Sequence, residues 1–165
     1  MRVKYISDKC KEINELVEEA KKWAERDEKL GAHLATYINV MMLGILEECI
    51  EHLVKERAKK PGDKEIENYI SKNITQSFKN PSYGAICSVL SRFSDQYQSE
   101  FQKAFSPNSS EAAALESILR NKTDVAHYGL ANLNLSINDV EKYILGVKNI
   151  LEKLEDLLLA EPIGS

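Results

Sequence analysis

Three side chains that could act on a phosphodiester lie close together between positions 120 and 127. Arg120, Asp124 and His127 follow one another at steps of four and three residues, so a helix would place them on one stripe, with the outer two about 10 Å apart along its axis. A guanidinium offers a planar, permanent charge that matches phosphate oxygens, and an imidazole titrates in the range needed for acid–base work. Chemistry at a phosphodiester can use a group that moves a proton together with a group that neutralises charge on the phosphorus oxygens.

The spacing by itself is weak evidence for a site. Chance places a histidine five to seven positions after an arginine in roughly one chain in four of this length and composition. Two structural readings therefore stay open. Arg120 and Asp124 could form an ordinary i,i+4 ion pair on a wet face, worth about 0.3–0.5 kcal/mol, and His127 could be a cation that favours a helix C-terminus.

The helix that carries the stripe is predicted to run from the loop at 106–110 to Gly129, since glycine is common just past a helix end. Its apolar side is made of Leu115, Ile118, Leu119, Val125 and Ala126. The polar stripe lies on the opposite side and should point away from the core. Lys122 falls on the apolar side, which predicts either a local distortion of the helix or a lysine that extends its charged end to solvent.

Helical periodicity continues through nearly the whole chain. The other predicted helices cover residues 9–26, 30–60, 63–78, 83–105 and 136–158. The second, apolar nearly all round between Ile38 and Leu46, should be central, and Ser136 with Asp139 resembles a capping box at the start of the last. Inward-facing side chains are predicted on the third (Ile66, Tyr69, Ile70, Ile74) and on the last (Val140, Ile144, Val147, Leu151, Leu154, Leu158).

These patterns predict one all-α domain over residues 1–165, an up-and-down helical bundle with one or two short accessory helices. The sequence shows no strand pattern, internal repeat or glycine-rich phosphate loop. The chemistry must therefore come from side chains on helices.

Composition limits the partners. The chain has 22 Lys+Arg against 26 Asp+Glu, a net charge of −4 and a pI near 5.5, so it has no general attraction to nucleic acid or to an anionic membrane surface. A site for phosphate would have to be positive locally. The longest apolar run, Val40–Leu46, is too short to span a bilayer, and we expect no membrane association.

The cysteines and histidines indicate neither disulfides nor a metal centre. Cys10, Cys49 and Cys87 are far apart, odd in number and form no CxxC motif, which favours reduced thiols and a cytoplasmic location. No His or Cys spacing matches a metal site, so no metal or other cofactor is expected. The N-terminus also lacks the apolar run of a signal peptide.

The context of the arginine and histidine resembles a known family. Asn121 follows Arg120 directly, a small residue precedes His127, Gly129 comes soon after, and the motif ends the penultimate helix. In these respects the chain resembles the HEPN superfamily, and in particular its RiboL-PSP-type members, whose ribonucleases carry Arg-x(4–6)-His, commonly with Asn after the Arg. The helix over 37–54, acidic from 46 to 51, and the run 119–158 are similar to the second and the last two helices of that fold.

Two details depart from the family pattern. Six residues separate Arg120 from His127, which is the long limit of the motif, and Tyr128 stands between the histidine and Gly129.

The resemblance implies a metal-independent endoribonuclease that acts on RNA as a homodimer, with two motifs meeting in one composite active site. His127 would be the general base or acid, Arg120 would stabilise charge on the phosphorane, and Asn121 would position the phosphate. Two stripes facing each other across a two-fold axis would form an enclosed, locally positive cleft. This arrangement would reconcile an outward-facing motif with an acidic protein.

Three further residues are candidates for supporting roles. Asp124 could hold Arg120 or His127 in place. Tyr128 could stack on a base or pack at the helix end, and Glu47 could match an acidic position of the family's second helix or be a rim carboxylate. His33 and His52 have no matching arginine and are predicted to be structural.

The resemblance also suggests a biological setting, a toxin or defence-system effector with an antitoxin or a neighbouring defence protein as its partner. The alternative is a non-catalytic HEPN helical dimer that serves as an adaptor or as the regulatory partner of a nucleotidyltransferase. An acidic surface suits protein partners better than free RNA.

Overall fold

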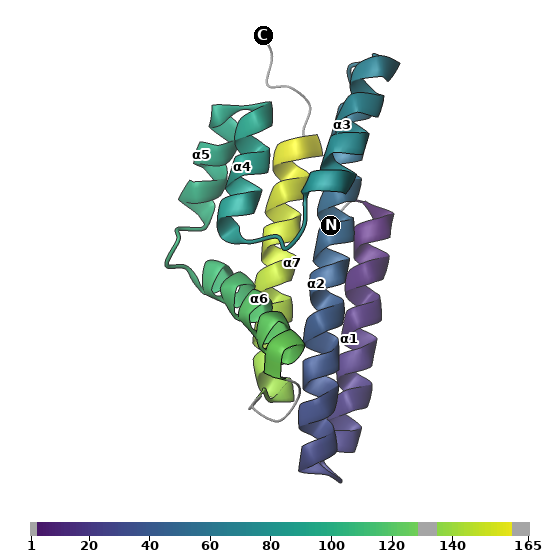
Figure 1. Cartoon of the computed structure of the whole chain (residues 1–165), viewed down its shortest axis with the longest axis vertical. Coiled ribbons are helices and arrows are strands. Elements are labelled where there is room, and N and C mark those ends of the chain that lie inside the picture. Colours follow the sequence, from purple (N-terminus) through teal and green to yellow (C-terminus); the bar gives the residue numbers. More distant parts are fainter. Residues whose placement is uncertain (1–2, 129–134, 160–165) are drawn as a thin grey trace.

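The computed structural model describes residues 3–128 and 135–159, and within them the chain forms helices and no strand. The helices are α1 (Lys4–Ala24), α2 (Glu28–Lys59), α3 (Lys64–Ser77), α4 (Tyr83–Phe93), α5 (Asp95–Ala104), α6 (Ser110–Tyr128) and α7 (Ile137–Leu159). Helices α1, α2 and α7 lie side by side along the long axis, and α6 crosses α7 and α2 (Figure 1). The predicted all-α bundle is confirmed.

Helix α2 is the centre of the bundle, as its apolar pattern predicted. It packs against α1, α3, α6 and α7, and Leu46 and Leu53 are fully buried. By length and composition alone α2 could also cross a membrane, and it is the one described helix that meets this test. Half of its most apolar stretch is buried inside the protein, because a central helix needs apolar side chains on several faces.

The prediction of one helix over 83–105 is wrong, because the chain turns at Ser94. This residue is extended (φ −169°, ψ 135°), and its Oγ accepts a hydrogen bond from the Gln96 backbone N–H at 3.2 Å. Serine competes for backbone groups in this way and favours helix starts over helix interiors. The turn folds α5 back beside α4, so that Phe101 is fully buried against Tyr83 and Phe105.

The predicted inward stripe of α3 is half wrong. Ile74 is buried, but Ile66 is 49% exposed and Tyr69 is 70% exposed. Helix α3 has α2 as its main neighbour, and α2 covers only the C-terminal half of the stripe. The apolar pattern therefore identified the helix correctly but not what would cover it.

The last helix matches its prediction. All six seam positions of α7 are buried, and the capping box forms. The Asp139 N–H donates to Ser136 Oγ at 3.2 Å, and the Ser136 N–H donates to Asp139 Oδ2 at 3.3 Å. Helix α7 supplies the surface on which α6 packs.

Two glycines of α2 provide a test of this packing. A Cβ at Gly31 would lie 2.6 Å from Ala24 Cβ and 3.0 Å from Ala24 Cα, whereas a Cβ at Gly44 would meet nothing within 4 Å. Gly31→Ala should lower the free energy of unfolding by about 1–3 kcal/mol, because α1 must move. Gly44→Ala should raise it by about 0.5–1 kcal/mol through helix propensity. Urea unfolding measures both, and equal effects would contradict the close α1–α2 approach.

Candidate functional site on α6

The motif lies on the outer side of α6. On the inner side Leu115 and Ile118 are fully buried, whereas Arg120 and His127 are exposed. The outward orientation of the stripe is therefore confirmed. Ala126, predicted on the apolar side, is exposed, because the end of α6 extends beyond the core and none of its described side chains after Ile118 is fully buried.

The structural reading of the stripe as an i,i+4 ion pair is not realised. Asp124 is half-buried, and no ion pair between it and Arg120 occurs in residues 3–128 and 135–159. The Arg120 guanidinium has no carboxylate partner anywhere in that described part of the chain. An exposed arginine without a carboxylate can accept a phosphate at little cost, because no existing ion pair has to break.

Asn121 faces α2 rather than solvent. Its Nδ2 lies 3.5 Å from Oδ1 of Asn39, at the outer limit of a hydrogen bond. Asn39 is only 1% exposed, and its own Nδ2 donates to the Ile118 carbonyl of α6 at 3.1 Å. A buried amide must find partners, so this contact fixes the rotation of α6 on α2 and with it the direction of the motif.

Asn39 was not among the residues predicted for the site. The available signal was one amide inside the apolar run around Ile38–Leu46. A polar side chain at such a position costs free energy unless it is hydrogen-bonded, so its presence indicates a specific contact.

Lys122 and Glu47 take part in a different contact. The Lys122 ammonium donates to Asn80 Oδ1 at 2.7 Å, and the Asn80 backbone N–H donates to Glu47 Oε1 at 2.8 Å. Lys122 is half-buried and reaches outward from the apolar side of α6, as one of the two predicted alternatives required. Glu47 thus holds the connection between α3 and α4 through this hydrogen bond. Of its two predicted alternatives, this structural role is closer to the rim carboxylate.

Asn80 has φ 54°, in the left-handed region that asparagine tolerates better than most residues. The connection that carries it therefore contacts α2 and α6 at the same time. Tyr128 ends α6, but its side chain, like Gly129, lies outside the described residues.

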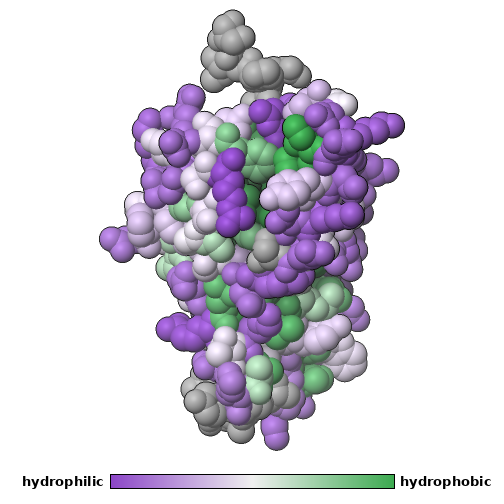
Figure 2. All heavy atoms as spheres, turned by 45° about the horizontal axis from the view of Figure 1, so that its top comes forward, coloured by the Kyte–Doolittle hydropathy of each residue, from purple (hydrophilic) through white to green (hydrophobic). Residues whose placement is uncertain are grey.

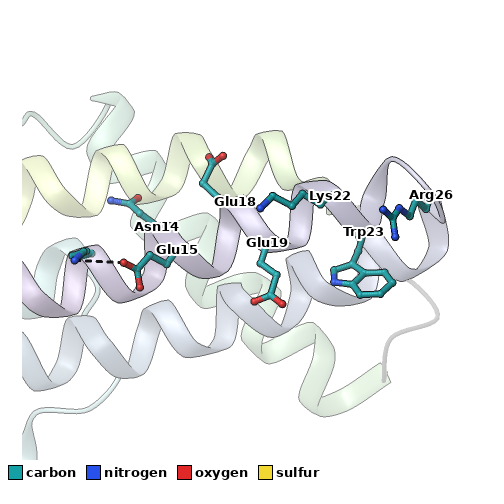
Figure 3. Close-up of a pocket in the computed structure, with 8 residues that line it drawn as sticks. Asn14, Glu15, Glu18, Glu19, Lys22, Trp23 and Arg26 are labelled. Carbon is teal, nitrogen blue, oxygen red and sulfur yellow. Dashed lines mark ion pairs between the residues drawn. The ribbon is translucent and has the colours of Figure 1, made fainter.

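The described hollows lie away from the motif. One of about 660 Å³ covers the outer side of α1 between positions 11 and 26. Figure 3 shows its side chains, among them the Lys11–Glu15 ion pair and Trp23, whose ring lies 5.6 Å from the Arg26 guanidinium carbon. Neither Arg120 nor His127 lines this hollow.

The described residues also offer no metal centre. No group of three His, Cys, Asp or Glu side chains is placed to hold an ion in residues 3–128 and 135–159. The chemistry available on α6 is therefore a guanidinium, an imidazole, an amide and a carboxylate.

A family model for the RiboL-PSP-HEPN domain matches residues 4–160, a range that contains all seven helices and the whole motif. The chain belongs to the RiboL-PSP-HEPN family. HEPN domains are generally associated with ribonuclease activity. Neither the comparison with curated proteins nor the comparison with solved structures returned a significant match.

The contact between Asn39 and α6 in this HEPN domain can be tested by changing one atom. In Asn39→Asp a carboxylate oxygen would face the Ile118 carbonyl in place of a donor. Burial would raise the pKa of the new carboxyl above its unfolded value, so stability present below about pH 4 is lost as pH rises. Relative to wild type, we expect unfolding at pH 8 to be easier by about 3 kcal/mol, with a smaller difference at pH 5.

Asn108→Asp, at an exposed loop position, is the control and should change stability by no more than about 0.5 kcal/mol at either pH. Urea unfolding curves at the two pH values provide the comparison. A destabilisation of Asn39→Asp that does not depend on pH would contradict a buried, hydrogen-bonded amide.

Proposed function

We propose that this HEPN domain is a metal-independent endoribonuclease in which two copies of the chain bring Arg120 and His127 to one cleft. One observation carries the proposal: the two side chains lie exposed on the same side of α6, directly opposite its buried side. Membership of a family associated with ribonucleases supports it. The electrostatic requirement supports it too, because two guanidiniums facing each other would make an acidic protein positive where phosphate binds.

The proposed reaction uses the substrate's own nucleophile. One His127 imidazole takes the proton of the ribose 2′-hydroxyl, and the 2′-oxygen forms a bond to phosphorus. Arg120 stabilises the charge on the phosphorane oxygens. The bond from phosphorus to the 5′-oxygen then breaks, and the imidazolium of the second copy protonates that oxygen. The products are a 2′,3′-cyclic phosphate and a 5′-hydroxyl.

The neighbouring side chains assist in this proposal. Asn121 has two N–H donors on its amide, so one can face Asn39 while the other positions a phosphate oxygen. Asp124 is one helical turn from both charged residues and can orient either when substrate is bound.

A homodimer is supported by two exposed apolar side chains on α2. Tyr37 is 59% exposed and Val40 is 38% exposed, and both lie within two positions of Asn39. Large apolar side chains at such a place gain free energy when a second copy covers them. We propose that these side chains of α2 belong to the dimer interface.

A second candidate function is a non-catalytic HEPN dimer that acts as an adaptor or as the regulatory partner of a nucleotidyltransferase. It is favoured by the observation that Arg120 and His127 line none of the hollows described for one chain. Induced expression separates the two functions. A toxin or defence-system effector that cuts RNA in the cytoplasm should arrest growth, and its His127→Ala variant should not, whereas an adaptor should arrest growth in neither form.

Purified protein should cut RNA in the presence of a chelator. His127→Ala should slow cleavage by about 10²–10⁴-fold and Arg120→Ala by about 10²–10³-fold. Because both side chains are exposed, their removal should change the free energy of unfolding by no more than about 0.5 kcal/mol. Gel analysis of labelled RNA measures the rates, and end-group analysis identifies the cyclic phosphate.

Arg26→Ala and His52→Ala are the matched controls and should retain cleavage. Arg26 lies over Trp23 at the end of α1, and His52 stacks on Tyr5, about 20 Å along α2 from Asn39. Undiminished cleavage by the Arg120 or His127 variant would refute the assigned roles.

The proposed dimer face has its own test. Tyr37→Glu should weaken self-association by about tenfold or more, since an aromatic side chain that the dimer would cover is replaced by a charge. Cleavage should fall at the same protein concentration. Leu145→Glu on α7 is a matched control, because Leu145 is 60% exposed and lies outside that face. Sedimentation equilibrium measures both variants, and identical association would contradict a dimer through α2.

A further inference from the structure

A second surface of the molecule has no role in the proposed nuclease. A hollow of about 420 Å³ lies between α3 and α4 with α2 as its floor. Figure 2 shows hydrophobic atoms gathered on the upper part of the visible face, bordered by hydrophilic ones. The lining residues are Val54, Tyr69, Ile70, Asn73, Ile74, Val89, Arg92 and Phe93. We call this surface the α3–α4 groove.

The apolar stripe of α3 continues past the part that α2 covers. Its residues follow the spacing of an amphipathic helix face, from Ile66 through Tyr69 and Ile70 to Ile74. Ile74 is only 6% exposed, whereas Tyr69 and Ile66, nearer the N-terminal end of α3, are 70% and 49% exposed. Contiguous exposed apolar surface of this kind marks a binding site more often than it marks a solvated face.

One arginine that lines the groove, and a second one near it on α2, lack carboxylate partners. Arg92 is exposed and lines the groove. Arg57, one turn along α2 from Val54, lies with its guanidinium carbon 6.0 Å from the Tyr97 ring centroid. Within the described residues neither forms an ion pair, whereas the neighbouring acids of α2, Glu51 and Glu56, are paired with lysines.

We propose that the α3–α4 groove binds an amphipathic helix of a partner protein whose polar flank is acidic. An apolar floor between two helices accepts the i, i+3/i+4 and i+7 side chains of such a helix. The unpaired guanidiniums complement carboxylates on its flank and steer its approach. In a chain with a net charge of −4, an unpaired arginine at the edge of an apolar groove favours this partner by charge as well as by shape.

Other occupants fit less well. An RNA strand would need cations along its whole path, but the described lining contains one arginine among mostly aliphatic and aromatic side chains. A second copy of this chain fits less well, because the apolar side chains proposed for the dimer, Tyr37 and Val40, do not line the groove.

The test uses three labelled helical peptides of about 20 residues and the full-length chain. The first has leucines at the groove spacing and glutamates on its flanks, the second has lysines in place of the glutamates, and the third has the first one's composition in scrambled order. Fluorescence anisotropy should give micromolar binding for the first peptide and at least about tenfold weaker binding for the others. Higher salt should reduce the preference.

Variants assign the binding to the groove. Tyr69→Ser and Arg92→Glu should each weaken binding of the acidic peptide by about tenfold or more. Because both side chains are exposed, the fold should be retained, and RNA cleavage should be unchanged, so a failure here is distinct from a failure of the proposed nuclease. Trp23→Ser and Arg26→Glu on the α1 surface are matched controls and should bind normally.

Several results would overturn the proposal. Equal affinity for the three peptides, or no binding at all, would leave the groove without a helical partner. A fluorescent RNA whose binding is lost in Arg92→Glu would assign the groove to nucleic acid. If Tyr69→Ser has a lower assembly mass than the wild type in sedimentation equilibrium, the groove is an interface between copies of this chain.

Discussion

The contact between α2 and α6 determines where the motif points. Asn39, buried in the apolar stretch of the central helix α2, donates to the Ile118 carbonyl. This bond defines one rotation of α6, because a different rotation would leave a buried amide without a partner. Apolar packing alone tolerates a range of helix rotations, since methyl groups have no directional requirement. The polar contact removes that freedom. Arg120 and His127 then face solvent because the helix side opposite Ile118 has nowhere else to point.

In the proposed nuclease, the charge distribution gives a physical reason for dividing the site between two copies of the chain. A protein with a net charge of −4 repels RNA at long range, and a lone exposed arginine does not overcome this. Doubling the local positive charge by symmetry creates a binding field only where two copies meet. In the proposed enzyme, association is therefore a condition for activity, and a single chain in solution is protected from cutting RNA at random.

The sequence predicted the fold class, the central helix, the last helix and the outward stripe, because each follows from periodicity or capping within one segment. It failed where the outcome depended on the neighbour. Ser94 was predicted to lie inside a helix, but its side chain caps the start of α5. Ile66 and Tyr69 were predicted to face the core, but they are exposed because α2 covers only half of α3. Asn39 could have been found as an amide in an apolar run, but its partner, a backbone carbonyl 79 residues away, has no signature in the sequence. The roles of Arg120, Asn121 and His127 rest on the family pattern, since periodicity says only which side of a helix they occupy.

In the connection between α3 and α4, position 80 accepts very few residue types besides asparagine. Its backbone has φ 54°, a conformation that most residues avoid. Its side-chain oxygen accepts a hydrogen bond from the Lys122 ammonium, and its backbone N–H donates one to Glu47. Glycine would keep the conformation and lose the acceptor. Aspartate would keep both but add a negative charge beside a carboxylate that already accepts from the same residue. Asparagine alone meets the steric, hydrogen-bonding and charge requirements together, so variation among natural sequences of this architecture should be narrower at this loop position than its exposure to solvent suggests.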